Sequence, residues 1–194
     1  MKRNKPKYKQ IIDAAVIVIA ENGYHQAQVS KIAKQAGVAD GTIYLYFENK
    51  EDILISVFHE KMGYFVEKMK EVIAEKETAA EKLLVMIENH FKILSKDRNL
   101  AIVTQLELRQ SNKELRMKIN EVLKEYLHVM DDILHYGQER DEFLKDIDIR
   151  LARQMIFGTI DETVTTWVIN EQKYDLVSLA PAVHKLLLRG CALR

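Results

Sequence analysis

Hydrophobic residues recur at helical spacing along almost the whole chain. The apolar residues between Ile11 and Ile19 lie three or four positions apart, so they share one face of a helix that Asn22-Gly23 should stop. Two shorter helices are predicted at about 29–35 and 40–47, with a turn containing Gly37 between them. A longer helix followed by two short ones around a glycine turn predicts a helix-turn-helix.

Longer helices are predicted from residue 50 onward. Their approximate ranges are 50–76, 79–95, 100–111, 113–136, 148–171 and 175–190. Gly137 should end the fourth, the polar segment 138–146 should be a loop, and Pro181 should mark a late start or a bend in the last. The predicted fold class is all-α, with an N-terminal helix-turn-helix domain of three helices over residues 1–50 and a larger helical domain over 51–194.

Composition supports this fold and narrows the function. Only 7 Gly and 2 Pro occur in 194 residues, with 47% hydrophobic residues, which suits helices. The single cysteine, Cys191, excludes an internal disulfide framework and suits a reducing cytosol. No export signal is evident, and no apolar run reaches the roughly 18 residues of a membrane span. We therefore expect a cytoplasmic protein with no membrane partner.

Nothing in the sequence predicts catalysis. The six histidines include no H-x-x-x-H pair, no acid completes a metal or nucleophile site, and no glycine-rich phosphate loop is present. We expect no catalytic residues, no metal and no cofactor.

Charge is distributed unevenly although the net charge is zero. Residues 1–50 carry eight lysines and arginines against four acids, a net of +4, and the remainder carries 21 against 25, a net of −4. A basic N-terminal module on an acidic body favours a nucleic-acid partner, although a solvated lysine-rich tail is the plain alternative.

The segment 40–47 carries an unusual surface. On a helix, Ile43 and Phe47 share the packed face, so Gly41 and Leu45 point to solvent, flanked by hydroxyl-bearing side chains. Glycine lets a helix approach base edges in the DNA major groove, and leucine can touch a thymine methyl group. The hydroxyls, together with the Lys50 ammonium, would contact phosphates. The predicted DNA-binding residues here are Asp40, Gly41, Thr42, Tyr44, Leu45, Tyr46 and Lys50, although either tyrosine could instead pack its ring between helices.

The same segment resembles a known family. The stretch IAKQAGVADGTIYLYFENKEDIL, residues 32–54, is similar to the signature of TetR-family bacterial transcriptional regulators. In that family a Thr or Ser often stands at the start of the helix before the turn, so the resemblance adds Gln28, Val29 and Ser30 to the DNA-binding candidates. It also implies a homodimer on palindromic double-stranded DNA, with recognition helices about 34–36 Å apart in successive major grooves.

The resemblance further implies that the two C-terminal helices form the dimer interface. Their apolar stripes give the interface candidates Ile156, Ile160, Val164, Trp167, Val183, Leu186 and Leu187. Such a stripe is as typical of ordinary core, so periodicity alone leaves both interpretations open.

In such regulators an effector occupies a cavity among the middle helices. Soft and aromatic candidates for its lining are Met62, Phe65, Met69, Met86, Phe91, Leu106, Met130 and Phe157, although each could be plain core. Helical spacing from 98 to 116 also gives a polar, mostly basic row that contains Arg98, Gln105, Arg109 and Arg116. This row either pairs with nearby glutamates or recognises an anionic head group.

A closer resemblance concerns the effector. The segments at residues 9–57, 100–120 and 150–176 are similar to the acyl-CoA-responsive fatty-acid-degradation regulators of bacilli, which implies a repressor released from its operator by long-chain acyl-CoA. Arg109 would then be the first candidate to meet the coenzyme phosphates. Asp161 and Glu162 could pair with Arg109 or Arg153, assist a dimer, or attract a cation. The last option corresponds to the alternative function, a TetR-type repressor of efflux genes that responds to cationic lipophilic drugs.

Overall fold

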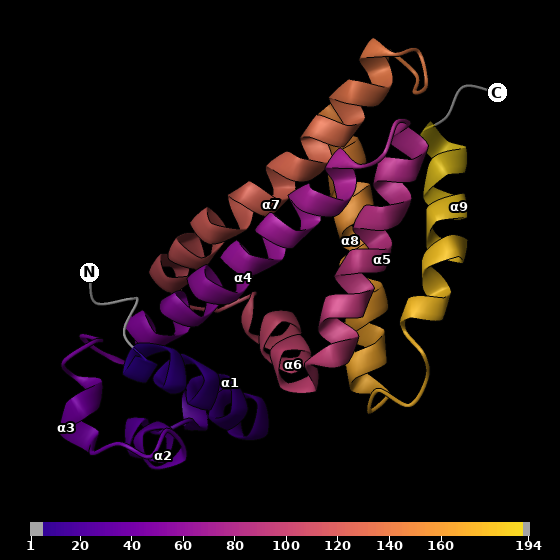
Figure 1. The fold of residues 1–194 in the computed structure, drawn as a ribbon. Helices are drawn as coiled ribbons and strands as arrows, with labels where there is room; N and C mark the ends of the chain where they lie inside the picture. The colour runs from indigo at the N-terminus through magenta and orange to yellow at the C-terminus, as the bar shows by residue number, and fades with distance from the viewer. Residues whose placement is uncertain (1–5, 192–194) are drawn as a thin grey trace. The chain divides into compact units, whose positions relative to one another are not determined.

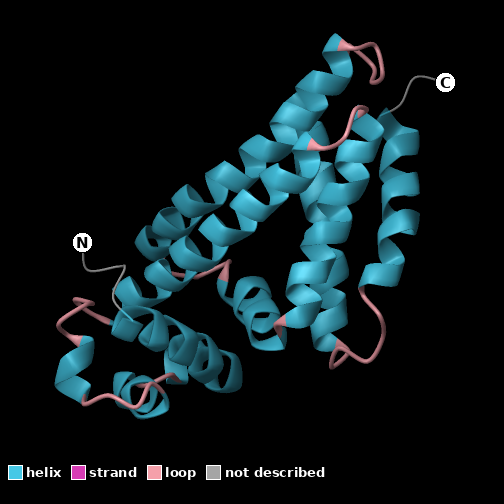
Figure 2. Cartoon of the chain, in the orientation of Figure 1, coloured by secondary structure: helices cyan, strands magenta, loops and turns pink. Residues whose placement is uncertain are grey.

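The structure is a computed structural model that describes residues 6–191, and this part of the chain consists of helices and loops without a strand (Figures 1 and 2). The helices are α1 Pro6–Gln26, α2 Val29–Gln35, α3 Asp40–Ile43, α4 Lys50–Ala74, α5 Ala79–Lys96, α6 Arg98–Glu107, α7 Lys113–Glu139, α8 Ile149–Ile169 and α9 Ala180–Cys191, with a 3-10 turn at Val177–Leu179 before α9. The predicted all-α fold is confirmed. No helix between residues 6 and 191 is both long and apolar enough to cross a membrane.

The chain forms two compact units. The first comprises the residues up to Gly63 together with 99–122, and the second comprises 64–98 together with the residues from Leu123 onward. The chain passes from one unit to the other three times, and each time it does so inside a helix, namely α4, α6 and α7.

The first unit is built on α1, which packs against α2, which in turn packs against α3. Its core is apolar and includes Ile11, Ile12, Ala15, Ile19, Ile32, Ala33, Ile43, Phe47, Ile53 and Leu54. The predicted stop in α1 is present as a break, because Gly23 has φ 72° and ψ 153°, a conformation that glycine adopts without strain. One further helical turn follows and ends at Gln26.

The second unit places α5, α8 and α9 side by side (Figure 1). The start of α5 carries a capping box, in which the side chain of Thr78 accepts from the Glu81 N–H and the Glu81 carboxylate accepts from the Thr78 N–H. The indole N–H of Trp167 donates to the carbonyl of Tyr174 at 2.8 Å and holds the loop after α8 against its own helix.

Several predicted boundaries were wrong, each for a physical reason. The third helix ends at Ile43 because residues 44–46 tighten into a turn in which the Tyr46 N–H donates to the Ile43 carbonyl at 3.0 Å. Gly137 does not end α7. Its missing side chain instead makes room for the ring of Phe143, which a Cβ at position 137 would overlap. The last helix begins at Ala180 and not near residue 175, so the late start that Pro181 predicted is confirmed; Pro181 is its second residue, where no N–H is needed.

Candidate DNA-reading face and effector site

The turn between α2 and α3 is fixed by backbone hydrogen bonds. Gly37 has φ 65°, and its N–H donates to the carbonyl of Lys34 at 3.1 Å. The N–H of Val38 donates to Ala33 at 3.0 Å, which closes the end of α2 as a glycine C-cap does. The sequence thus sets the angle at which α3 leaves α2.

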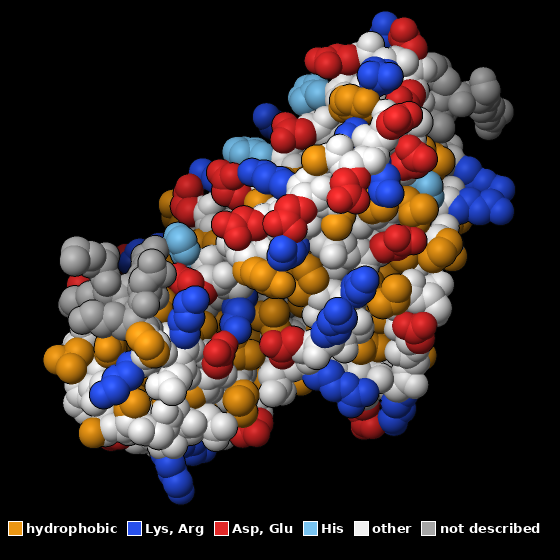
Figure 3. Space-filling model, viewed as in Figure 1, with side chains coloured by type: hydrophobic (Ala, Val, Ile, Leu, Met, Phe, Trp, Pro, Cys, Tyr) orange, Lys and Arg blue, Asp and Glu red, His pale blue; other side chains and the backbone are white. Residues whose placement is uncertain are grey.

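The face of α3 and its following turn is arranged as its periodicity predicted. Ile43 and Phe47 are buried, whereas Tyr44 is 59% exposed and Leu45 is 64% exposed. Gly41 is exposed too, and a Cβ built there would meet nothing within 4 Å. Figure 3 shows hydrophobic side chains at the surface over this part of the first unit. Gly41, Tyr44 and Leu45 therefore form an exposed strip that takes no part in packing within the protomer.

The other predicted DNA-binding residues differ in exposure. Gln28, Ser30 and Asp40 are exposed, and Val29 and Thr42 are half-buried. Gln28 occupies the N-cap of α2 but its side chain makes no capping hydrogen bond. The Tyr46 ring lies 6.3 Å from that of Tyr8 and is half-buried, so this tyrosine follows the packing alternative whereas Tyr44 does not.

Lys50 has a structural role in addition to any predicted phosphate contact. Its ammonium donates to the carbonyls of Tyr24 and His25, at 3.0 Å each, and lies 4.7 Å from the centre of the Tyr24 ring. These carbonyls belong to the last turn of α1, where a cation satisfies both unpaired acceptors and the helix dipole.

The same tyrosine receives a contact from the end of α6. The Glu107 carboxylate accepts from the Tyr24 backbone N–H at 2.8 Å and from the Gln110 side chain at 2.5 Å. Burial, and then the charges of Glu51 and Glu107, raise the pKa of the Tyr24 hydroxyl to about 12. This junction of Tyr24, Lys50 and Glu107 joins α1, α4 and α6 within the first unit.

The second unit contains a cluster of aromatic rings contributed by four helices. Phe65 from α4 contacts His90 of α5 and Tyr126 of α7 edge-on, with centroid distances of 5.1 Å and 5.4 Å. Phe91 lies beside His90, and Phe157 of α8 lies beside Tyr126. Three of these rings were predicted as effector-lining residues; Met69, Met86 and Met130 of the same prediction are also buried in this unit.

His90 and Tyr126 were missed by sequence reasoning. The His90 Nδ1 and the Tyr126 hydroxyl are 2.7 Å apart, and both side chains are buried. Burial lowers the pKa of the His90 imidazole to about 3; burial, and then the charge of Asp161, raise that of the Tyr126 hydroxyl. The signal in the sequence was the position of His90 on the same inward stripe of α5 as Leu83 and Ile87.

The predicted cationic row is not one helical face. α6 ends at Glu107 and α7 begins at Lys113, so the spacing that aligned the row is interrupted. Arg98 donates to the Gln172 carbonyl at 3.3 Å, and Arg116 donates to the Gln110 carbonyl at 2.7 Å. Arg109 is exposed in the turn between the helices. Of the remaining candidates, Gln105 is buried, Leu106 is exposed and Met62 is half-buried.

The two adjacent acids of α8, Asp161 and Glu162, differ in their exposure to solvent. Asp161 is buried, and Glu162 is exposed and accepts from the Thr166 hydroxyl at 3.2 Å. Arg153 has its ion pair with Asp131, at 2.6 Å.

The predicted interface stripe of α8 lies inside the protomer. Ile156, Ile160, Val164 and Trp167 are each at most 3% exposed, and Val183 of α9 is buried, so these side chains have little surface to offer a partner. Leu187 is half-buried, and Leu186 is 69% exposed. The opposite face of α8 is the open one, with exposed Leu151, Met155 and Ile169.

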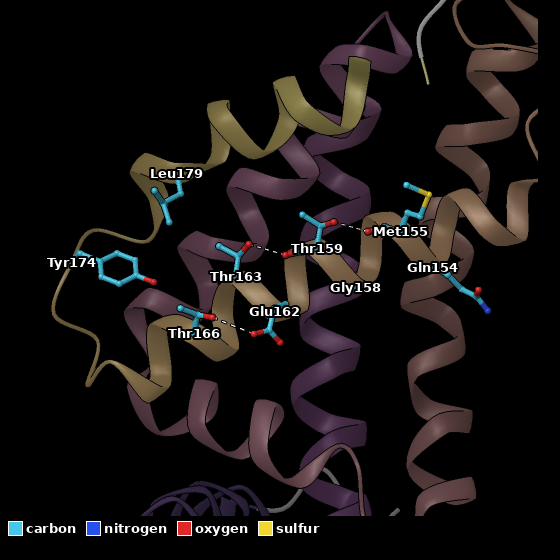
Figure 4. A pocket seen from close by; sticks show the side chains of 9 residues that line it. All are labelled: Gln154, Met155, Gly158, Thr159, Glu162, Thr163, Thr166, Tyr174 and Leu179. Atoms are coloured by element: carbon cyan, nitrogen blue, oxygen red, sulfur yellow. Dashed lines mark hydrogen bonds between the residues drawn. The ribbon is translucent and has the colours of Figure 1, made fainter. Parts of the chain in front are cut away.

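A groove runs along that open face. It has a volume of about 680 Å³ and is lined by Gln154, Met155, Gly158, Thr159, Glu162, Thr163, Thr166, Tyr174 and Leu179 (Figure 4). The hydroxyls of Thr159 and Thr163 donate to the carbonyls four residues earlier, so they present mainly methyl groups outward. The interface prediction therefore moves to this face and remains a prediction.

These features define the class of protein, a helix-turn-helix regulator with a larger helical companion unit. Residues 11–57 match the bacterial regulatory proteins of the tetR family, and residues 58–190 match the YsiA-like C-terminal region. The chain belongs to the TetR family of bacterial regulatory proteins, which confirms the resemblance that the sequence carried.

The particular relatives are regulators rather than enzymes. The chain is 70% identical over 190 residues to the fatty acid metabolism regulator protein of Bacillus subtilis (strain 168), with 98% of each chain covered. It superposes on the Bacillus subtilis transcriptional regulator FadR, solved in complex with stearoyl-CoA, with a TM-score of 0.93 at 70% identity, covering 94% of this chain and 98% of that one. The fatty acid degradation regulator FadR from Bacillus halodurans gives a TM-score of 0.92 at 64% identity, covering 96% and 100%.

Proposed function

We propose that this chain is a cytoplasmic, homodimeric repressor of fatty-acid degradation genes that long-chain acyl-CoA releases from its operator. The observation that carries the proposal is the 70% identity, over nearly the whole chain, to a fatty acid metabolism regulator whose structure holds stearoyl-CoA. The exposed strip of α3 would bind the operator, and the region of the aromatic cluster would bind the acyl-CoA.

The exposed strip of α3 supports DNA binding. Gly41 has open space around it, so no contact inside the protomer requires glycine there, whereas close approach to a groove does. Leu45 offers a methyl contact, and the Tyr44 hydroxyl can donate to a phosphate oxygen. Asp40, Thr42, Gln28 and Ser30 stay candidates for flanking contacts, and Lys50 anchors the end of α1 to the start of α4.

A second copy of the chain is the occupant we propose for the α8 groove. Two α8 helices can approach closely where Gly158 lies, because a Cβ there would meet nothing within 4 Å inside the protomer. A second hollow of about 260 Å³ continues the same surface between α8 and α9, with Leu151, Met155 and Leu186 in its lining. Burying these exposed apolar side chains would drive association.

The switch requires an effector that binds the released state more tightly than the DNA-bound state. We propose that the acyl chain enters among the helices of the second unit, near the aromatic cluster, and that Arg109 meets the coenzyme phosphates. α4 continues without interruption from Lys50 to Ala74, so a displacement of its second half is carried along the helix to its first half. In a dimer this would alter the spacing of the two recognition helices and lower operator affinity.

Fluorescence anisotropy on DNA from the gene's own upstream region tests the proposal. The protein–DNA complex is titrated separately with stearoyl-CoA, free CoA, stearate and a lipophilic cationic dye. We expect that stearoyl-CoA releases the protein from the DNA and that the other three compounds do not, because both the acyl tail and the coenzyme contribute to binding. Release by the dye in place of the thioester would replace the acyl-CoA function with drug sensing, and absence of binding to the DNA would refute the repressor function.

A further inference from the structure

One buried polar atom in the aromatic cluster has no partner. Among the residues that the structure describes, the Nε2 of His90 makes no hydrogen bond, although the side chain is buried. The other ring nitrogen, Nδ1, lies 2.7 Å from the Tyr126 hydroxyl. Leaving a buried donor or acceptor unpaired costs about 1–3 kcal/mol, so His90 is an expensive residue at this position.

Packing alone does not explain the histidine. Its neighbours are the rings of Phe65, Phe91 and Tyr126, at centroid distances of 5.1 Å, 6.1 Å and 5.6 Å. An apolar side chain would suit these surroundings without an unpaired nitrogen. Two of these neighbours, Phe65 of α4 and Phe91 of α5, were predicted as effector lining, and the third ring comes from α7.

The electrostatics restrict what could bind to Nε2. Burial holds the imidazole in its neutral form, so it has no charge with which to compensate a desolvated anion such as a phosphate or carboxylate. In the tautomer in which the Tyr126 hydroxyl donates to Nδ1, the proton is on Nε2, and that nitrogen is a neutral donor. Its matching partner is a neutral acceptor attached to an apolar chain.

We propose that the Nε2–H of His90 donates a hydrogen bond to the thioester carbonyl oxygen of the bound acyl-CoA. This inference rests on the proposed function and deepens it, because it names the side chain that reads the thioester. In acyl-CoA this carbonyl is the neutral acceptor directly attached to the acyl tail. His90 then determines specificity for a thioester over compounds that carry the same tail without the carbonyl.

The test compares two ligands that differ only at the carbonyl. Stearoyl-CoA and S-octadecyl-CoA, a thioether with a methylene in place of the carbonyl, are titrated against the operator complex of the full-length protein. For the unaltered protein we expect stearoyl-CoA to act at about tenfold lower concentration, the equivalent of one hydrogen bond of about 1.4 kcal/mol. His90→Phe should bring that ratio close to one. His90→Met also removes the donor, and its flexible side chain adapts to the site. This second variant replaces His90→Phe if the phenylalanine ring prevents folding.

Two controls separate this reading from a structural role. His128→Gln alters an exposed histidine of α7 and should leave the ratio unchanged. Tyr126→Phe keeps the ring but removes the hydroxyl that pairs with Nδ1. The imidazole proton is then no longer held on Nε2, so the ratio between the two ligands should fall partway toward one. A ratio near one for the unaltered protein, or an unchanged ratio in both His90 variants, would overturn the inference. Failure of stearoyl-CoA itself to release the unaltered protein would instead overturn the proposed function, and this inference with it.

Discussion

The Glu107–Tyr24 contact provides the sharpest test of how the helix-turn-helix is held. We predict that Glu107→Ala destabilises the first unit, because the substitution removes the acceptor of the Tyr24 backbone N–H and a partner of the Gln110 amide. The bond joins residues that are 83 positions apart in the sequence, so it holds α1 against the end of α6. Water can reach this half-buried site, which limits the loss.

The magnitude follows from the kind of bond. A hydrogen bond to a charged acceptor contributes about 1.5–3 kcal/mol, and partial exposure reduces this to about 1–2 kcal/mol for Glu107. The folded-to-unfolded ratio of the first unit should fall by about 5- to 30-fold. Operator affinity should fall by at most the same factor, because only the competent geometry binds DNA. Glu107→Gln keeps an oxygen acceptor without the charge, so its effect should be smaller.

The test measures the free energy of unfolding in urea and the operator affinity by fluorescence anisotropy, on the same preparations of each variant. Glu114→Ala is the matched control, since it removes an exposed glutamate of the first unit whose partner is Lys118 in the next helical turn. That control should leave both readouts unchanged. If Glu107→Ala matched the unaltered protein in unfolding and in DNA affinity, the contact would have no energetic role and the reasoning would be wrong.

Four further outcomes are expected. Gly137→Ala should lower stability by about 1–3 kcal/mol in thermal unfolding, because its methyl group overlaps the buried Phe143 ring. Gly63→Ala should raise helix stability by up to about 1 kcal/mol, since the position in α4 is open; a lower melting temperature would contradict this. Unfolded His90 takes up a proton below about pH 6.5 and the folded imidazole only near pH 3, so stability should fall by about 2 kcal/mol from pH 7 to 5, and His90→Phe should lose this dependence. Met155→Glu should yield monomers in sedimentation analysis, whereas an equivalent charge at exposed Met117 should not.

Local information was sufficient for the presence of the helices, although not for all of their ends, and for the exposed face of α3. The 3.6-residue period placed Ile43 and Phe47 inside and Tyr44 and Leu45 outside, and the structure agrees although α3 itself is shorter than predicted. Periodicity succeeds there because a short helix packed on one side has only one way to bury its apolar residues. The break at Gly23 was visible for the same local reason.

One glycine and one apolar stripe lie beyond the reach of such local inference. Gly137 looked like a helix end, but its role is to admit a ring from six residues later, and only the tertiary structure shows that ring. The stripe of Ile156, Ile160 and Val164 was equally compatible with core and interface, because periodicity identifies the buried face of a helix and not what buries it. The exposed face beside it gave no strong sequence signal, since threonines and a glutamate alternate with its apolar residues.

Contacts between distant residues explain why the effector side was harder to predict than the DNA side. His90 and Tyr126 are 36 positions apart, and Arg98 and Gln172 are 74 apart, yet each pair is joined by hydrogen bonds. Periodicity within one segment carries no information on such pairs, because it identifies the buried face of a helix and not the distant residue that covers it.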